Sequence, residues 1–400
     1  MAKKKELQDS FTNPINKNDA KDELADILSD SLNKKFKDQG QVVFTLNDKE
    51  NPSNIVDWVS TGNSALDLYI SNTPNGGFAV GRLTEITGLE SSGKSLLAGH
   101  AIANTQKKGG LAIYIENETS LFKAFLETLG VDTSKMLYVN LDTVEDIFAA
   151  IEDIVLKVRE KNKNRLVTIV VDSIAEASSK VEQEATYDKA GYNTTKAIVI
   201  SQAMRKLMPL IARQRVCLIC INQLREKVGL TMPGADKYSV PGGKAIGFHA
   251  TTRIRVAVTG KIKMKINGVD EIVGTTVKAK IVKSKLGPAN REVEYEAFYN
   301  AGIKDYTNWI DILVKYGKAE KVGMSYQIVD ETTGEIYKYS SKNWEEVLKT
   351  DEKIRAIAYK QLCDVLVMDY ENMEIDSDNL IREQSNSEAG FWMIRNKYLY

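Results

Sequence analysis

The chain has 400 residues, and its 54 lysines and arginines balance its 54 aspartates and glutamates, so the formal net charge is zero. Hydrophobic residues make up 43% and charged residues 27%, as in an ordinary globular protein. This length exceeds what one hydrophobic core usually organises, so we expect one large domain with smaller appendages. Because no global charge attracts nucleic acid, any DNA-binding surface must concentrate its basic groups on one face.

Two further features exclude function classes. No apolar run approaches the ~20 residues that span a bilayer. The N-terminal "MAKKKELQDS" also has no apolar stretch behind its lysines, unlike a secretory signal. We therefore expect a cytoplasmic protein that does not bind a membrane.

Cys217 and Cys220 have the C-x-x-C spacing of redox and zinc sites. On a strand, residues three apart point to opposite faces, so we interpret both as buried core residues.

The N-terminal part of the chain predicts a helix over residues 19–36. Its apolar residues recur at helical spacing, namely Leu24, Ile27, Leu28, Leu32 and Phe36. The helix is one-faced and isolated, so its apolar stripe needs a partner. That partner is either its own core or a neighbouring subunit.

Strands and helices then alternate along the chain. The predicted strands are "RLTEIT", "LAIYIENE", "MLYVNL", "LVTIVVDS" and "VCLICINQ", and the predicted helices cover residues 96–106, 144–161 and 192–212. This alternation predicts an α/β fold with a mostly parallel sheet. Residues 225–244 are rich in Gly and Pro and predict a long loop that is either functional or disordered. Beyond it, "TTRIRVAVTG", "TVKAKIVKSK" and "EVEYEAFYN" alternate like antiparallel strands, and a hairpin, "QIVDETTGEIYKY", follows.

The stretch "GLESSGKS" at residues 88–95 fits the pattern G-x-x-x-x-G-K-[ST], between a predicted strand and a predicted helix. Backbone N–H groups of such a loop, together with the helix N-terminus, cradle phosphates. Lys94 would reach the β- and γ-phosphates, and the Ser95 hydroxyl would ligate Mg²⁺. The pattern therefore predicts a nucleotide site.

Carboxylates at strand ends are the candidates for the remaining chemistry. Asp172 closes "LVTIVVD" and is placed to ligate Mg²⁺. It could also cap a helix in "SIAEASS", and the two roles can coexist. Glu116 and Glu118 in "YIENE" could orient or deprotonate water. Strand alternation sends both to the same side, so spacing does not choose between them, and a solvated strand end is the alternative.

Together with "VVDS", "SQAMRKL", "INQLREKVG" and "PGGKAIGF", this loop resembles the RecA family of DNA-strand-exchange recombinases from about Trp58 to Gly302. The resemblance implies a RecA-like core with ATP and Mg²⁺ as cofactors. The positions that it assigns to ATP are Gly88, Glu90, Ser91, Ser92, Gly93, Lys94, Ser95, Leu96 and Phe125. Phe125 would stack on adenine, with a helix core residue as the alternative. Glu118 matches the catalytic glutamate, and Glu116 the acidic residue two positions before it.

The same resemblance assigns coupling and DNA-binding positions. Gln223 matches the glutamine that senses the γ-phosphate. Lys283 and Lys285 match catalytic lysines that reach the ATP of the neighbouring subunit. The DNA-contacting positions are Arg205, Arg225, Lys227, Gly242, Gly243 and, in place of an expected asparagine, Lys244. The alternative is that these charged residues have no DNA-binding role and simply keep a surface loop solvated. The first DNA loop, residues 182–197, keeps the family's length but not its residues, so no contacts are assigned there.

We therefore expect an ATP-dependent recombinase that forms a helical filament on single-stranded DNA and exchanges strands with duplex DNA. The expected divisions are residues 1–50 as a tail and oligomerisation helix, 51–302 as the ATPase core, and 303–400 as a small α+β domain and tail. Divergence between the motifs favours a phage-borne or distant family member. Single-strand-binding and loader proteins are possible partners. Two alternatives stay open: a hexameric helicase or other ring motor, and a non-hydrolysing DNA-coating regulator.

Overall fold

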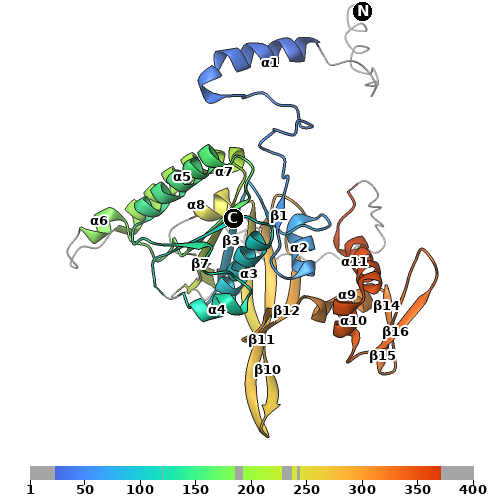
Figure 1. The fold of residues 1–400 in the computed structure, drawn as a ribbon. Helices are drawn as coiled ribbons and strands as arrows, with labels where there is room; N and C mark the ends of the chain where they lie inside the picture. The colour runs from blue at the N-terminus through green and yellow to red at the C-terminus, as the bar shows by residue number, and fades with distance from the viewer. Residues whose placement is uncertain (1–22, 120, 185–191, 228–236, 241–243, 371–400) are drawn as a thin grey trace, which may run out of the picture. The chain divides into compact units, whose positions relative to one another are not determined.

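The computed structural model describes residues 23–119, 121–184, 192–227, 237–240 and 244–370 (Figure 1). The chain divides into two compact units, residues 1–54 and 55–400. In the first unit, α1 (Glu23–Lys35) precedes a short 3-10 helix, η1 (Lys37–Gln39). This confirms the described part of the predicted N-terminal helix. Its apolar stripe is exposed, with Ile27 at 64% and Leu28 at 52%.

The second unit is built on a mixed sheet of nine strands among the described residues. The spatial order is β13 (Gly302–Ile303), β12 (Glu292–Phe298), β11 (Val269–Ser284), β10 (Thr252–Ile266), β3 (Leu83–Gly88), β7 (Val216–Gln223), β6 (Val167–Asp172), β4 (Leu111–Glu116) and β5 (Met136–Asn140). The six strands from β10 to β5 are parallel. A mostly parallel α/β core was predicted, and the structure confirms it. A two-stranded sheet of β1 (Trp58–Val59) and β2 (Phe78–Ala79) precedes β3.

Helices cover both faces of the sheet (Figure 1). On one side are α2 (Ser64–Ser71), α3 (Lys94–Lys107) and α4 (Lys123–Thr128), and on the other α5 (Val144–Lys161), α7 (Tyr192–Arg213) and α8 (Ala245–His249), with α6 (Lys180–Gln183) leading towards α7. Central strands are therefore apolar on both faces. Cys217 packs in the first core and Cys220 in the second. Both cysteines are buried, as predicted, and they point to opposite faces of β7.

The sequence of α5 shows why these helices form where they do. The Thr143 side chain accepts a hydrogen bond from the Asp146 amide and caps the helix, which begins at Val144. Acidic residues in the first turn and basic residues in the last turn oppose the helix dipole. Ile147, Ile151 and Val155, spaced four apart, are buried against the sheet.

A long hairpin, β10–β11, extends beyond the rest of the sheet (Figure 1). Its turn at Asn267–Gly268 has φ values of 51° and 84°, the left-handed conformation that two-residue hairpin turns require. The predicted antiparallel pairing holds between β10, β11 and β12. On its other edge, however, β10 pairs in parallel with β3. The sequence did not predict this second neighbour, because alternation within a strand carries no information about which strands lie beside it.

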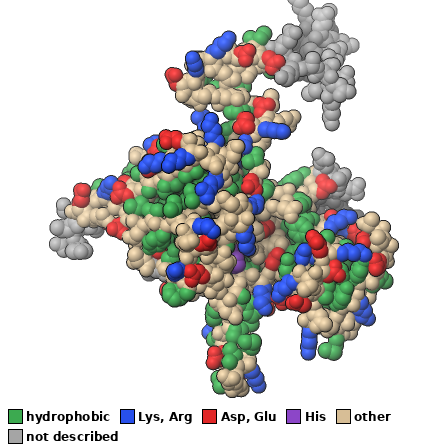
Figure 2. All heavy atoms as spheres, viewed as in Figure 1, with side chains coloured by type: hydrophobic (Ala, Val, Ile, Leu, Met, Phe, Trp, Pro, Cys, Tyr) green, Lys and Arg blue, Asp and Glu red, His purple; other side chains and the backbone are tan. Residues whose placement is uncertain are grey.

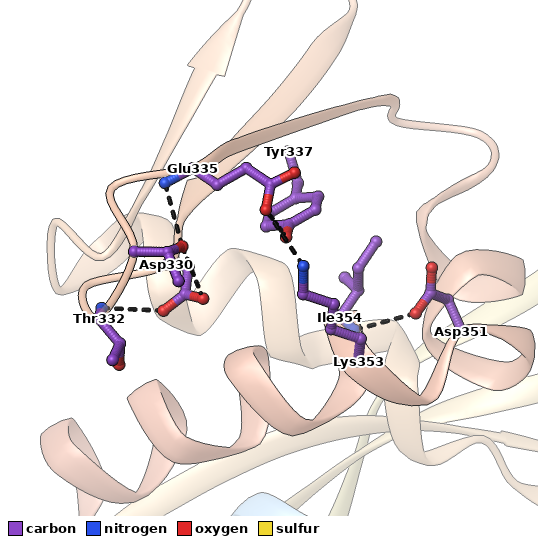
Figure 3. A network of polar contacts seen from close by, with 8 residues as sticks. Asp330, Thr332, Glu335, Tyr337, Asp351, Lys353 and Ile354 are labelled. Atoms are coloured by element: carbon purple, nitrogen blue, oxygen red, sulfur yellow. Dashed lines mark hydrogen bonds and ion pairs between the residues drawn. The ribbon is translucent and has the colours of Figure 1, made fainter.

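The C-terminal region contains helices around a small sheet. Its elements are η2 (Asp305–Asn308), α9 (Trp309–Lys315), β14 (Ala319–Val322), β15 (Ser325–Val329), β16 (Ile336–Ser340), α10 (Trp344–Thr350) and α11 (Glu352–Leu366). The predicted hairpin is confirmed as β15–β16. A polar network closes it (Figure 3): Asp330 accepts from the Thr332 amide at 2.9 Å, and Glu335 accepts from the Lys353 amino group at 3.1 Å.

Among the described residues, no helix combines the length and the apolar character that crossing a bilayer would require.

Candidate nucleotide and DNA site

The carboxyl ends of the central parallel strands bring the predicted site residues to one sheet edge. Gly88 at the end of β3 pairs with Gln223 at the end of β7. Asp172 at the end of β6 lies beside β7 on one side and pairs with Glu116 of β4 on the other. Ligands of open α/β sheets bind at this edge. The sequence alone placed each residue at a strand end, and the sheet order makes them neighbours.

The phosphate loop runs from the end of β3 to Lys94, the first residue of α3. A Cβ at Gly88 would lie 2.2 Å from the Ser92 hydroxyl, so only glycine fits this tight turn. Gly93 has a φ of 95°, which also favours glycine. The buried Ser92 hydroxyl has no hydrogen-bond partner within the described part of the chain. Lys94 donates to the Leu89 carbonyl at 2.7 Å and so folds back over the loop.

Ser95 and Asp172 form the centre of the site. The Ser95 hydroxyl donates to Asp172 Oδ2 at 3.0 Å, and the Tyr114 hydroxyl donates to the same oxygen at 2.7 Å. Burial raises the pKa of Asp172, and the two hydroxyl groups partly offset this rise. An adjacent hydroxyl and carboxylate are the hard oxygen ligands that Mg²⁺ prefers, so these residues fit the ion. Asp172 does not cap a helix, because residues 174–176 form a turn; that alternative was wrong.

The structure distinguishes the two glutamates. Glu116 ends β4, is 2% exposed, and accepts hydrogen bonds from the Tyr138 hydroxyl at 3.0 Å and the Leu121 amide at 3.3 Å. Glu118 lies beyond the strand end in an exposed bend, so strand alternation does not relate the two residues as expected. Glu116 is thus committed to hydrogen bonds that hold the following loop, whereas Glu118 is accessible.

Charged groups around Glu118 shift its pKa. Partial burial raises its pKa, and the carboxylates of Asp172, Glu176 and Glu116 raise it further, while Lys94 opposes them. Burial lowers the pKa of Lys94, and Asp172, Glu118 and Glu90 favour its charged form. Glu118 therefore lies close enough to the phosphate loop to interact electrostatically with Lys94.

A cleft of about 390 Å³ opens beside the phosphate loop. The predicted ATP-binding residues that line it are Ser91, Ser92, Gly93, Lys94, Ser95, Leu96 and Phe125. Gly88 is buried in the turn and Glu90 is exposed outside the lining. The opposite wall was missed from sequence and consists of Thr275, Val277, Ala297, Phe298 and Tyr299. These residues come from β11, β12 and the turn that follows, far from any motif. A larger groove of about 610 Å³ between α5 and α7 contains no part of the phosphate loop.

Gln223 lies between the start of the phosphate loop and the predicted second DNA loop. The amide after it, that of Leu224, donates to the Gly88 carbonyl at 2.9 Å. The loop then begins as a two-stranded ribbon, β8 (Arg225–Glu226) with β9 (Tyr238–Ser239). Exposed Arg225 pairs with Glu176 at 2.9 Å, so this predicted DNA contact has an intramolecular partner here.

The other described residues predicted to contact DNA or the ATP of a neighbouring subunit do not line the cleft. Lys227 and Lys244 are exposed where the described parts of the second loop end. Arg205 is exposed on α7, and with Lys283 and Lys285 it lowers the pKa of His249, although burial contributes most. On the face shown in Figure 2, basic and acidic side chains are interspersed. The predicted Gly242 and Gly243, and residues 185–191 of the first DNA loop, lie outside the described residues.

Lys283 and Lys285 are not brought to this chain's own phosphate loop. Thr252 of β10 pairs with Ser284 of β11 on one side and with Thr84, near the start of β3, on the other. The two lysines therefore lie level with the beginning of β3, whereas the phosphate loop follows its end. Lys283 donates to the Gly247 and Phe248 carbonyls at 2.9 and 2.7 Å.

Comparisons with known proteins agree with this architecture. The RecA N-terminal domain family model matches residues 24–304. The chain is 35% identical over 280 residues to Protein RecA of Cereibacter sphaeroides, covering 70% of this chain and 77% of that protein. It is 34% identical over 307 residues to Protein RecA of Aquifex aeolicus, covering 76% and 84%. For Protein RecA of Wolbachia pipientis the identity is 32% over 347 residues, covering 86% and 92%.

These matches extend well beyond the phosphate loop, which many unrelated ATPases share, and they include the strands, the hairpin and the segment that carries the DNA loops. They do not favour a ring motor or a non-hydrolysing regulator. The chain therefore belongs to the RecA family and is an ATP-dependent DNA recombinase, a DNA-dependent ATPase that catalyses strand exchange.

Proposed function

We propose that the chain binds ATP and Mg²⁺ in the cleft beside the phosphate loop and in that state assembles as a helical filament on single-stranded DNA. The observation that carries this proposal is the direct pairing of Gly88 with Gln223. It joins the nucleotide loop to the strand from which the second DNA loop begins. A ligand at one can therefore alter the other.

The proposed ATP site uses residues with separate tasks. Ser92, whose buried hydroxyl has no partner in the described structure, and the loop amides would donate to phosphate oxygens. Lys94 would exchange the Leu89 carbonyl for the β- and γ-phosphates, whose charge favours its protonated form. Ser95 and Asp172 would hold Mg²⁺, which neutralises negative charge on the phosphate oxygens. Phe125 would stack on the adenine from the cleft wall.

Glu118 is the proposed general base. Its side chain is accessible. Its pKa is raised, so its affinity for a proton is closer to the affinity that a general base needs near neutral pH. Glu116 is the weaker candidate because Tyr138 and Leu121 already occupy its carboxylate. In the proposed reaction Glu118 orients the attacking water and accepts its proton.

DNA would bind along the second loop and nearby basic side chains. Arg225, Lys227 and Lys244 stand where the described parts of that loop end, and Arg205 is exposed on α7. Contacts from such residues to phosphates give affinity without sequence preference, which suits a protein that acts on any sequence. Arg225 would have to leave Glu176 to contact DNA, a small cost for a pair with a 60% exposed arginine side chain.

The filament would complete each ATP site with a neighbouring subunit. Lys283 and Lys285 lie level with the start of β3, whereas the phosphate loop follows the end of that strand. We therefore assign the two lysines to the nucleotide of an adjacent subunit. The exposed apolar stripe of α1 would dock on an adjacent subunit. We place this activity in the cytoplasm, with single-strand-binding and loader proteins as further partners.

Two measurements test the proposal. The ATPase rate should rise when single-stranded DNA is added. Electron microscopy with a non-hydrolysable ATP analogue and the same DNA should show helical filaments. Closed rings under those conditions would favour a motor, and DNA binding without any turnover would favour a non-hydrolysing regulator.

A further inference from the structure

A buried polar cluster joins β3, β7 and β10 and takes no part in the site described above. Glu85 of β3 is fully buried and accepts hydrogen bonds from Asn222 of β7 at 2.7 Å and from Arg253 of β10. The Arg253 side chain is 28% exposed. Three adjacent strands thus each contribute one member. A buried carboxylate needs such partners, because an unpaired charge in the interior is strongly unfavourable.

The cluster lies close in the chain to both ends of the second DNA loop. Asn222 directly precedes Gln223, after which the loop begins at Arg225. At the other end the loop leads into α8, where Arg253 packs against Gly247. A Cβ at position 247 would lie 2.8 Å from the Arg253 guanidinium carbon, so the glycine is what lets the side chain pass. The segment between the two ends covers residues 225–244.

The same contacts continue to Lys283. Its amino group donates to the carbonyls of Gly247 and Phe248 at the end of α8. Burial lowers the pKa of Lys283, and the positive charges of Lys285 and Arg253 add to this effect. A displacement of Arg253 would therefore change the contacts of both α8 and Lys283.

One buried oxygen of the cluster has hydrogen-bonding capacity that the described residues do not use. The buried Asn222 Oδ1 has no hydrogen-bond partner among the residues that the structure describes. Buried polar atoms of native proteins are nearly always paired, so this oxygen can accept a further hydrogen bond. Its neighbour Gln223 is the proposed sensor of the nucleotide.

We propose that Glu85, Asn222 and Arg253 form a positioning clamp between the two ends of the second DNA loop. The clamp transmits a change at Gln223 through β3 to α8 and Lys283, so that nucleotide state and DNA affinity stay coupled. This inference rests on the proposed function of Gln223. None of the three residues is a catalytic residue, because none touches the nucleotide cleft or its lining.

The test measures DNA affinity in two nucleotide states. Asn222→Leu removes one hydrogen bond and keeps the buried ion pair. A double variant, Glu85→Leu with Arg253→Met, removes both charges together, which proteins often tolerate better than losing one. Arg253→Lys is the conservative variant that keeps the charge. Glu335→Gln with Lys353→Met removes an exposed pair in the C-terminal region and serves as the control.

For the wild type and the control we expect single-stranded DNA to bind roughly 5- to 150-fold more tightly with a non-hydrolysable ATP analogue than with ADP. In Asn222→Leu and the double variant this ratio should fall to about 1–2 while ATP affinity stays near wild type. The melting temperature of Asn222→Leu should also fall, because buried Glu85 loses a hydrogen bond, but the protein should stay folded at the temperature of the titrations. Arg253→Lys should recover part of the ratio. A purely structural role would change melting and leave the ratio intact.

A full wild-type ratio in folded Asn222→Leu and in the folded double variant would overturn the clamp. Should the double variant fail to fold, Asn222→Leu alone decides, because it retains the charge pair. A wild-type ratio of one would instead refute the proposed coupling at Gln223. The two failures are therefore distinguishable.

Discussion

Gln223 stands opposite Gly88 in the parallel pairing of β7 with β3, and the amide of the next residue donates to the Gly88 carbonyl at 2.9 Å. The last residue of one strand and the first residue of the phosphate loop are therefore fixed side by side. The proposed second DNA loop begins two residues after Gln223, at Arg225. A hydrogen bond from its amide to a γ-phosphate would exist with ATP and be absent with ADP, which is the difference that a ligand needs to shift a two-state loop.

Gln223→Ala should keep ATP binding but bind single-stranded DNA equally weakly with ATP analogue and with ADP. The wild type should show a difference of roughly 5- to 150-fold, the usual range of allosteric coupling. The measurement is a pair of DNA titrations at one fixed salt concentration, since salt alone changes such affinities greatly. Asn140→Ala, at the end of β5, is the matched strand-end control. If Gln223→Ala retained the full difference, the switch would lie elsewhere.

Lys94→Ala should abolish nucleotide-dependent DNA binding and leave the fold intact, because Lys94 is half-exposed and its side chain donates to the carbonyl of the adjacent loop residue Leu89. Binding of a fluorescent ATP analogue and thermal melting measure the two effects. Lys107→Ala, in the last turn of the same helix, should change neither. Wild-type ATPase activity in Lys94→Ala would end the proposal for this residue.

Glu118→Gln should still bind ATP and DNA but hydrolyse ATP at least ~100-fold more slowly, the usual contribution of a general base. Glu116→Gln should mainly lower stability, because it disturbs the contacts to Tyr138 and Leu121. Single-turnover hydrolysis separates the two effects. The opposite pattern would exchange the roles of the two glutamates.

The pH dependence of turnover provides a further check on Glu118. A general base works in its ionised form, so activity falls as the pH drops through its pKa. Since that pKa is raised, the acid limb of the wild-type rate profile should lie above the ordinary range for a glutamate. The residual activity of Glu118→Gln should lack this limb.

Deleting residues 1–38 should leave a soluble ATP-binding core that no longer forms filaments. A finer variant is Ile27→Lys with Leu28→Lys, which places charge in the exposed apolar stripe of α1. Asp26→Lys on the same helix is the control. Filament length by electron microscopy is the measurement. Unchanged filaments in the deletion would mean that α1 docks on its own core.

Asp67 of α2 should make stability depend on pH. It is 6% exposed, and burial raises its pKa to about 7, although the Ser60 hydroxyl and Thr61 amide donate to it. Between about pH 4 and 7 the folded state holds this proton and the unfolded state does not, so stability falls as pH rises, by at most ~1.4 kcal/mol per pH unit. Asp67→Asn should remove this slope. Urea unfolding of both proteins at pH 5 and 7 measures it, and parallel slopes would contradict the assignment.

The sequence by itself determined the parts of this protein that depend on local pattern. Near-continuous apolar runs identified β6 and β7, and the predicted helix over residues 144–161 has the bounds of α5. The spacing of "GLESSGKS" identified the phosphate loop, because its chemistry needs those residues in consecutive positions. The C-x-x-C pair was read as core from strand alternation alone, and the structure places its members in opposite cores.

Tertiary structure decided what depends on which strands become neighbours. The sequence did not predict that β10 lies beside β3, that Tyr114 donates to Asp172, or that Tyr299 lines the nucleotide cleft. It also could not separate Glu116 from Glu118, because the choice depends on where β4 ends and on a tyrosine from β5. The clamp around Glu85 joins residues up to 168 positions apart. Such contacts arise only when the strands assemble into the sheet, since a local pattern specifies a strand and not its partners.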